Sequence, residues 1–133
     1  MVKVVFGKKG TSKTKRMIEF VNDCVSTTTG SVIFVDDSDQ LKYDLDRKVR
    51  YINVRDYLKK DEGQLFGFLA GIMASNYDIS HIFIDRFIYV YKDDKEVFFD
   101  RIKEISDKEG IDFYISFSSE DGIVPDYLKE FIV

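Results

Sequence analysis

The octapeptide GKKGTSKT, residues 7–14, lies between two segments of different periodicity. Residues 2–6 before it form a short apolar run that predicts a buried β-strand. After it, Met17, Val21 and Cys24 follow the spacing of one face of an α-helix. A glycine-containing turn between a strand and a helix brings backbone N–H groups and the positive end of the helix dipole to one place. This stretch therefore predicts a strand, an anion-binding turn and a helix, the opening of an α/β fold.

The rest of the chain continues to alternate between strand and helix patterns. Apolar or alternating runs predict four more strands, and three further stretches predict helices. The predicted strands are residues 32–35, 49–54, 81–85 and 112–119; the predicted helices are 64–76, one striped by residues 98–105 and closed by Gly110, and a short last one that opens at Pro125. We expect residues 1–133 to form one three-layer αβα domain with a mostly parallel, five-stranded sheet.

Polar residues follow four of the five predicted strands. The loop 7–14 follows the first strand, the acidic run DDSD at 36–39 follows the second, Asp85 follows the fourth and residues 118–120 end the fifth. Ligands of parallel sheets bind beyond the carboxyl ends of the strands. All of these polar groups are therefore expected at one edge of the sheet.

Composition excludes several classes of protein. Hydrophobic residues make up 44% of the chain and aromatic residues 15%, which is too apolar for a disordered protein. No apolar run reaches the roughly 18 to 20 residues that cross a bilayer, no export signal is visible, and the lone Cys24, predicted as core, suits a reducing compartment. We therefore expect a cytoplasmic protein with no membrane partner. The net charge of −4 argues against general nucleic-acid binding, whereas a local basic cluster suits a small anion; the cluster is Lys8, Lys9, Lys13, Lys15 and Arg16.

The loop resembles the phosphate-binding loop of the P-loop NTPases. Gly7, Gly10, Lys13 and Thr14 stand at the spacings at which that loop places its glycines, its lysine and its magnesium-binding hydroxyl. The order of the elements resembles the RecA-like branch of the family. VIFVDDSDQL is similar to the segment that carries a catalytic glutamate there, HIFID to the Walker B strand and DFYISFSS to the sensor strand. The whole chain is also similar to short bacterial P-loop proteins described as ATP-binding or, loosely, as twitching-motility ATPase-like.

The resemblance implies a ligand and roles for particular residues. The ligand would be ATP or GTP with Mg²⁺, with Lys13 at the outer phosphates, Thr14 on the metal and Asp85 on the metal through water. The other interpretations are a solvated cation for Lys13 and a turn residue or helix cap for Asp85. The residues implied to bind the phosphates are Gly7, Lys8, Lys9, Gly10, Thr11, Ser12, Lys13 and Thr14.

The chain departs from the pattern of an active enzyme at two places. Ser12 occupies a position that favours glycine, where a positive φ costs another residue roughly 1 to 2 kcal/mol. Arg86 follows Asp85, where a glutamate is often found. In the RecA-like register the catalytic glutamate falls at Ser38, so the flanking Asp37 and Asp39 are the predicted catalytic carboxylates; the other interpretation of this run is an acidic turn.

These departures favour a weak NTPase or a nucleotide-dependent switch over a fast enzyme. The alternative is a non-catalytic protein-interaction module that keeps the fold without the nucleotide. A small-molecule kinase is disfavoured because no arginine-rich lid segment is evident. Besides the nucleotide, a second copy of the chain or another protein is an expected partner.

Two further features of the sequence can be interpreted as structural rather than catalytic. His81 has no clustered partner in the sequence and is predicted to be a structural histidine. The aromatic run RFIYVYKDD, residues 86–94, either packs over the core or forms an exposed patch for a partner.

Overall fold

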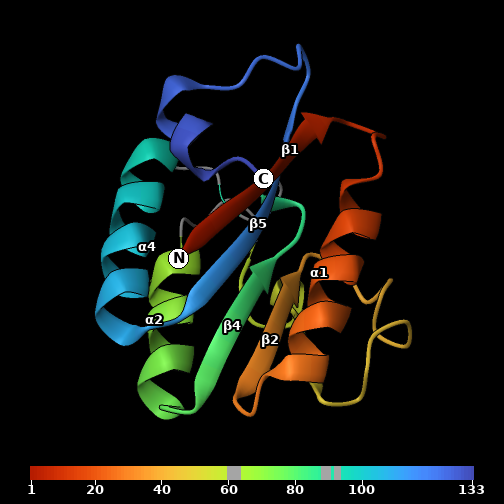
Figure 1. Cartoon of the computed structure of the whole chain (residues 1–133), viewed down its shortest axis with the longest axis vertical. Helices are drawn as coiled ribbons and strands as arrows, with labels where there is room; N and C mark the ends of the chain where they lie inside the picture. Colours follow the sequence, from red (N-terminus) through yellow and green to blue (C-terminus); the bar gives the residue numbers. More distant parts are fainter. Residues whose placement is uncertain (60–63, 88–90, 92–93) are drawn as a thin grey trace.

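In a computed structural model of the chain, which describes residues 1–59, 64–87, 91 and 94–133, five strands form one sheet (Figure 1). All neighbouring strands in it are parallel, so the expected mostly parallel sheet is wholly parallel. The spatial order is β1-β5-β4-β2-β3. The strands are β1 (Val2–Lys8), β2 (Ser31–Asp36), β3 (Val49–Asn53), β4 (Ile79–Ile84) and β5 (Asp112–Ser119).

Helices cover both faces of this sheet, as a three-layer αβα arrangement requires. Figure 1 shows α1 (Lys13–Thr27) on one side, with α2 (Leu65–Ser75) and α4 (Lys95–Glu109) on the other. The Asp94 carboxylate caps α4 by accepting from the Val97 N–H at 3.2 Å, and the predicted stop at Gly110 is confirmed by its left-handed φ of 68°. None of the helices in the described residues combines the length and apolarity needed to cross a membrane.

Two short segments differ in detail from the expectation. The last helix, η2 (Asp126–Phe131), is a 3₁₀ rather than an α-helix, and Pro125 precedes it as an extended cap residue with ψ of 144°. A second 3₁₀ turn, η1 (Val54–Asp56), follows β3 and was not predicted; the Asn53 side chain accepts a hydrogen bond from the Arg55 N–H at 2.9 Å and starts it.

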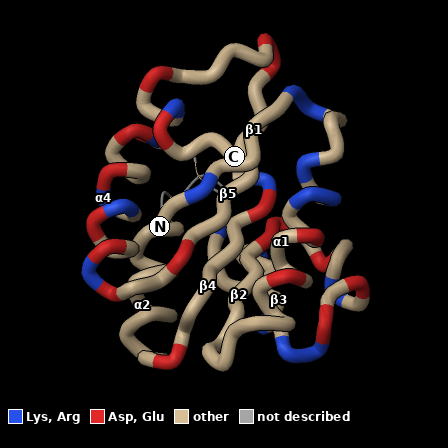
Figure 2. Tube along the Cα trace, in the orientation of Figure 1, with Lys and Arg blue, Asp and Glu red and all other residues tan. Residues whose placement is uncertain are grey.

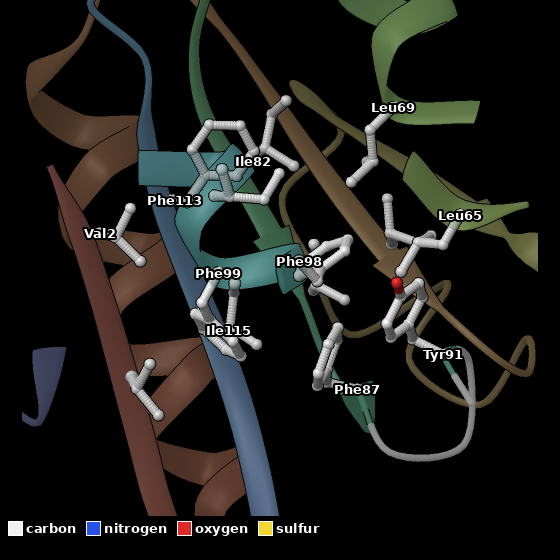
Figure 3. Packing of buried hydrophobic residues seen from close by; sticks show 14 of the residues in the cluster. Val2, Leu65, Leu69, Ile82, Phe87, Tyr91, Phe98, Phe99, Phe113 and Ile115 are labelled. Carbon is white, nitrogen blue, oxygen red and sulfur yellow. The ribbon is translucent and has the colours of Figure 1, made fainter. Parts of the chain in front are cut away.

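A hydrophobic cluster of aliphatic and aromatic side chains fills the core between the sheet and helices α2 and α4 (Figure 3). Phe87 is fully buried and stacks on Tyr91 with ring centroids 5.5 Å apart, while Phe98 lies 4.9 Å from Phe87. The packing interpretation of residues 86–94 is therefore confirmed for Phe87 and Tyr91. Residues 88–90 and 92–93 of that run lie outside the described residues.

On the face covered by α1, a row of stacked rings crosses four adjacent strands. Tyr51, Phe34, Phe83 and Tyr114 occupy paired positions on β3, β2, β4 and β5. Successive ring centroids are 5.6, 6.0 and 4.6 Å apart, with interplanar angles of 15°, 10° and 12°. Such cross-strand contacts fix the register of a sheet. Cys24 packs in the same cluster as a free, buried thiol, as predicted.

The register of these rings determines which polar residues meet at the carboxyl edge. Side chains two residues apart on a strand point to the same face. Two residues beyond Phe34, Phe83 and Tyr114 come Asp36, Asp85 and Ser116. These polar groups therefore line up on the face of the sheet that α1 covers, beside the N-terminus of that helix.

Candidate functional site

The loop between β1 and α1 is a tight turn that folds back on the end of its strand. The N–H and the Oγ1 hydroxyl of Thr11 both donate to the Lys8 carbonyl, at 3.2 and 2.6 Å. Ser12 is the N-cap residue of α1 but makes no side-chain cap bond, and the described first turn of α1 contains no acidic side chain. The first turn of α1 therefore supplies no negative charge of its own to the helix N-terminus, which favours an anion from elsewhere.

The backbone conformation of the loop explains why it contains glycines and why a serine at position 12 is unfavourable. A Cβ on Gly7 would lie 2.5 Å from Thr11 Oγ1, so a side chain at that position would displace the Thr11 hydroxyl and its hydrogen bond to the Lys8 carbonyl. Gly10 has a φ of 84°, which suits glycine. Ser12 has φ 65° and ψ 27°, so the positive φ predicted for this position is confirmed.

Lys13 folds over the loop instead of extending into solvent. Its ammonium donates to the Lys8 carbonyl at 2.7 Å. Partial burial lowers the pKa of Lys13, and the nearby Asp85 carboxylate opposes that shift. The ammonium of Lys13 is therefore held beside the turn.

Asp85, directly after β4, links the start of α1 to β5. Its side chain is 1% exposed; Oδ2 accepts from Thr14 Oγ1 at 3.0 Å and Oδ1 accepts from Ser116 Oγ at 2.5 Å. Both hydrogen bonds come from other elements of the chain, α1 and β5. The structure brings together the two residues predicted to hold a metal.

Asp36 is a site residue that the sequence analysis missed. It is 1% exposed, accepts from the Asp37 N–H at 2.8 Å and lies 2.7 Å from the Tyr51 hydroxyl. Burial raises the pKa of Asp36 to about 6, and the negative charge of Asp85 adds to that rise. A signal was present, because Asp36 directly follows the apolar run 32–35 and shares a face with Phe34 two positions earlier.

The two predicted catalytic carboxylates lie in different surroundings. Asp37 is close to the site: its Oδ1 is 3.1 Å from Arg86 Nε, at the distance of an ion pair but without the alignment of a hydrogen bond. Asp39 is exposed and lines a separate hollow beside β3, together with Lys42 and Arg50. Of the two, Asp37 alone lies beside the residues around Asp85.

Two neighbouring cavities open at this edge of the sheet. One, of about 350 Å³, is lined by loop residues 9–14 and by the strand-end residues Asp85, Arg86, Ser116 and Ser118. The second, of about 270 Å³, shares Thr14, Asp85 and Arg86 with the first and adds Asp36, Gln40 and Leu41. Gly7 and Lys8 belong to β1 and support the turn. Figure 2 shows the basic residues gathered where β1 leads into α1.

The donor atoms at the shared wall fit a magnesium ion bound together with a phosphate. Mg²⁺ takes oxygen ligands and is usually held by one or two protein groups, with water and phosphate oxygens completing its shell. The Thr14 hydroxyl and the Asp85 carboxylate are such a pair. Among the described residues, no group of three or more His, Cys, Asp or Glu side chains is arranged to hold a metal without a phosphate.

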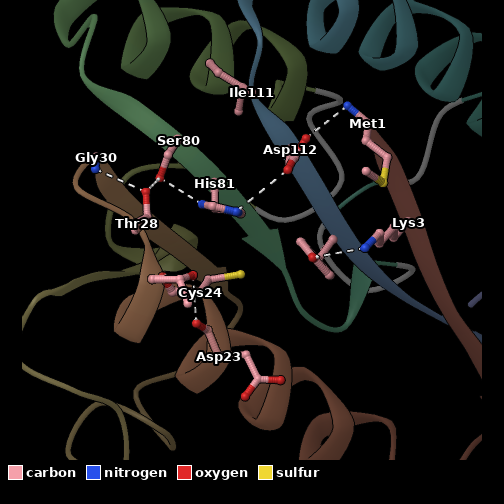
Figure 4. A network of polar contacts seen from close by, with 12 residues as sticks. Met1, Lys3, Asp23, Cys24, Thr28, Gly30, Ser80, His81, Ile111 and Asp112 are labelled. Carbon is pink, nitrogen blue, oxygen red and sulfur yellow. Dashed lines mark hydrogen bonds and ion pairs between the residues drawn. The ribbon is translucent and has the colours of Figure 1, made fainter.

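A second polar cluster lies at the opposite end of the sheet, around His81 (Figure 4). His81 Nδ1 is 2.8 Å from Ser80 Oγ, and its Nε2 is 3.7 Å from an oxygen of Asp112. Burial lowers the pKa of His81, while Asp112 opposes that shift. The partners of the ring are structural groups of β4 and β5, which agrees with the predicted structural role.

Comparison of the chain with protein-family models and with curated proteins found no match. The fold and the site therefore define the protein only as a class. It is an α/β domain with an all-parallel sheet, in which a basic glycine-containing loop and two buried carboxylates, Asp36 and Asp85, line two neighbouring cavities at the carboxyl edge.

Proposed function

We propose that this protein binds ATP or GTP together with Mg²⁺ and acts as a weak NTPase or a nucleotide-dependent switch. One observation carries the proposal. Thr14, at the start of α1, donates to the buried Asp85 at the end of β4, beside a cavity of about 350 Å³ walled by the basic loop. This contact supports the proposal, because the resemblance of the sequence to the RecA-like P-loop NTPases implies that Thr14 and Asp85 hold one metal ion together.

The roles of the binding residues follow from their chemistry. Loop N–H groups, the N-terminus of α1 and the Lys13 ammonium would bind phosphate oxygens. Thr14 and Asp85 would hold Mg²⁺, which neutralises charge on the outer phosphates. The Thr14–Asp85 hydrogen bond pre-positions both oxygens on one wall.

Hydrolysis also needs a carboxylate that accepts a proton from water. Asp36 shares the second cavity with Thr14 and Asp85, and a pKa of about 6 leaves it largely ionised at neutral pH. Tyr51 and the Asp37 N–H both hold Asp36 in place, which limits how far it can move toward a water. We propose Asp36 as the first carboxylate to test for turnover, and Asp37 and Asp39 stay predictions.

The switch part of the proposal involves a partner. A nucleotide changes an equilibrium only if it binds two states with different affinity. A second copy of the chain, or another protein, whose association depends on the nucleotide would supply the second state. Sizing in solution with and without Mg²⁺-nucleotide tests this. We also propose a cytoplasmic location, supported by the single free thiol of Cys24.

The experiment is calorimetric titration of the native chain, Lys13→Ala and Lys15→Ala with ATP and GTP, with and without Mg²⁺. Lys15 is the matched control because it is exposed, belongs to the same basic cluster and does not line the cavity. We expect saturable binding that Lys13→Ala weakens by roughly tenfold or more and Lys15→Ala changes by less than about threefold. Absence of binding to the folded native protein at millimolar nucleotide would refute the proposal and favour a non-catalytic interaction module.

A further inference from the structure

We propose that Arg86 distinguishes a nucleoside triphosphate from a diphosphate, and that Asp37 competes with the terminal phosphate for its guanidinium. This inference rests on the proposed function, since it concerns the same cavity. Arg86 directly follows Asp85 and lines both the larger cavity beside the loop and the smaller one beside Asp36.

The backbone of Arg86 is held in an uncommon conformation. Among the described residues, Ser12 and Arg86 are the two non-glycine residues with positive φ, at 65° and 55°, and both line the larger cavity. A left-handed conformation costs such a residue roughly 1 to 2 kcal/mol, and such strain tends to occur at functional sites. The Arg86 N–H donates to Ser116 Oγ at 2.8 Å, and Ser116 donates to Asp85. This chain of bonds fixes where the Arg86 side chain leaves the sheet.

The position of Arg86 across the cavity assigns it to the end of a phosphate chain. One wall consists of loop residues 9–14, where Lys9 and Lys13 are the basic side chains. The other wall comes from the ends of β4 and β5. Among the described residues of that wall, Arg86 has the positively charged side chain. Two phosphates can be bound by the loop and the N-terminus of α1. A third phosphate, extending from the loop toward the strand ends, adds the negative charge that Arg86 faces.

The contact between Arg86 and Asp37 is of the kind that a phosphate can replace. The two side chains are 41% and 15% exposed, and Nε and Oδ1 are 3.1 Å apart without hydrogen-bond alignment. The pair is partly buried, and Asp37 Oδ1 accepts no hydrogen bond from the described residues, whereas guanidinium and phosphate form short, paired, charge-assisted hydrogen bonds. A terminal phosphate would therefore take over Arg86 and release the Asp37 carboxylate next to the site.

The test compares dissociation constants measured by calorimetry with Mg²⁺. The ligands are the non-hydrolysable imido analogues of ATP and GTP, and ADP and GDP. The proteins are the native chain, Arg86→Gln, Arg86→Lys and Asp37→Asn, with Arg47→Gln and Asp44→Asn as controls for charge. Arg47 and Asp44 are exposed residues that line neither cavity at the carboxyl edge. Thermal melting confirms that each variant is folded.

We expect Arg86→Gln to weaken triphosphate binding by roughly ten- to one-hundred-fold and diphosphate binding by less than about threefold. Arg86→Lys, which keeps the charge without the planar fork, should lose less. Asp37→Asn should strengthen triphosphate binding by up to about fivefold, because it removes the competitor. The two controls should leave every constant within about twofold.

The results separate this inference from the proposed function. If native protein binds neither class of nucleotide, the proposed function fails and this inference fails with it. If it binds both classes, but Arg86→Gln weakens them equally or not at all, the nucleotide site stands and the role of Arg86 is refuted. If Asp37→Asn weakens triphosphate binding, the competition between Asp37 and the phosphate is refuted.

Discussion

Replacement of Ser12 by glycine is expected to stabilise the fold. The Ser12 backbone has φ 65° and ψ 27°, a conformation that costs an L-residue roughly 1 to 2 kcal/mol. Glycine avoids that cost but loses about 0.5 to 1 kcal/mol more chain entropy on folding. The exposed Ser12 side chain makes no cap bond, and the 3.3 Å bond from the Arg16 N–H goes to its carbonyl, which glycine keeps. The free energy of unfolding should rise by about 0.5 to 1 kcal/mol.

Two further variants test whether the change in stability comes from the backbone conformation rather than from the side chain. Ser12→Ala removes the hydroxyl but keeps Cβ in the same conformation, so its stability should stay within about 0.5 kcal/mol of the native value. Gly10→Ala is the converse change. Gly10 has a φ of 84°, and no described heavy atom lies within 4 Å of the position that an alanine methyl would take there, so the loss of about 1 kcal/mol comes from φ rather than from a clash.

The assay is urea and thermal unfolding followed by far-ultraviolet circular dichroism, without nucleotide. For a chain of this length the expected gain for Ser12→Gly corresponds to about 2 to 4 °C in melting temperature. Equal stabilities of Ser12→Gly and Ser12→Ala would refute the assignment of strain to φ. A Gly10→Ala variant as stable as the native chain would refute it independently.

Two other changes test the surroundings of the loop. Asp36 has a pKa of about 6 against an ordinary value of 3.8, so its carboxyl contributes stability fully below about pH 4 and loses it as the pH rises through 6. The free energy of unfolding of the native chain relative to Asp36→Asn should therefore fall by roughly 2 to 2.5 kcal/mol between pH 4 and pH 7 in urea titrations, and a flat difference would contradict the raised pKa. Gly7→Ala places a Cβ 2.5 Å from Thr11 Oγ1, so it should lower the free energy of unfolding by about 1 to 3 kcal/mol and also weaken nucleotide binding. Gly71 is exposed on α2, and no described atom lies where its added Cβ would be. Gly71→Ala should therefore raise the free energy of unfolding by about 0.5 to 1 kcal/mol in the same assay. Equal effects of the two alanines would show that the loop tolerates the side chain.

The strands and main helices could be predicted because their signals are local. Apolar runs and helical stripes lie within single segments, and Gly110 ends α4 where its left-handed φ was expected. The last segment differs because its partners are distant in sequence. The Val133 N–H donates to the Val4 carbonyl at 3.1 Å, and Ile132 bridges Val4 beside β1. A six-residue segment tied to a strand in this way forms a 3₁₀ turn rather than a longer helix.

The candidate site could be predicted only in part for a similar reason. The spacing of the loop residues predicted a positive φ at position 12, because the motif itself favours glycine at that position. The importance of Asp36 depends on register, and the Arg86–Asp37 contact depends on β2 lying next to β4. The order of strands in a sheet is a long-range property that no single segment carries.

The stacked rings of the core and the carboxylates of the site belong to one arrangement. Phe34 and Phe83 are paired across β2 and β4, and the next residues on the same face are Asp36 and Asp85. A slip of one residue between these strands would turn one carboxylate to the α2 and α4 face, where it would be buried without its partners. The rings therefore do more than fill the core. They hold two mutually repelling carboxylates on one face, and this closeness is part of why the pKa of Asp36 is raised and why a cation bound between the loop and the strand ends would be favoured.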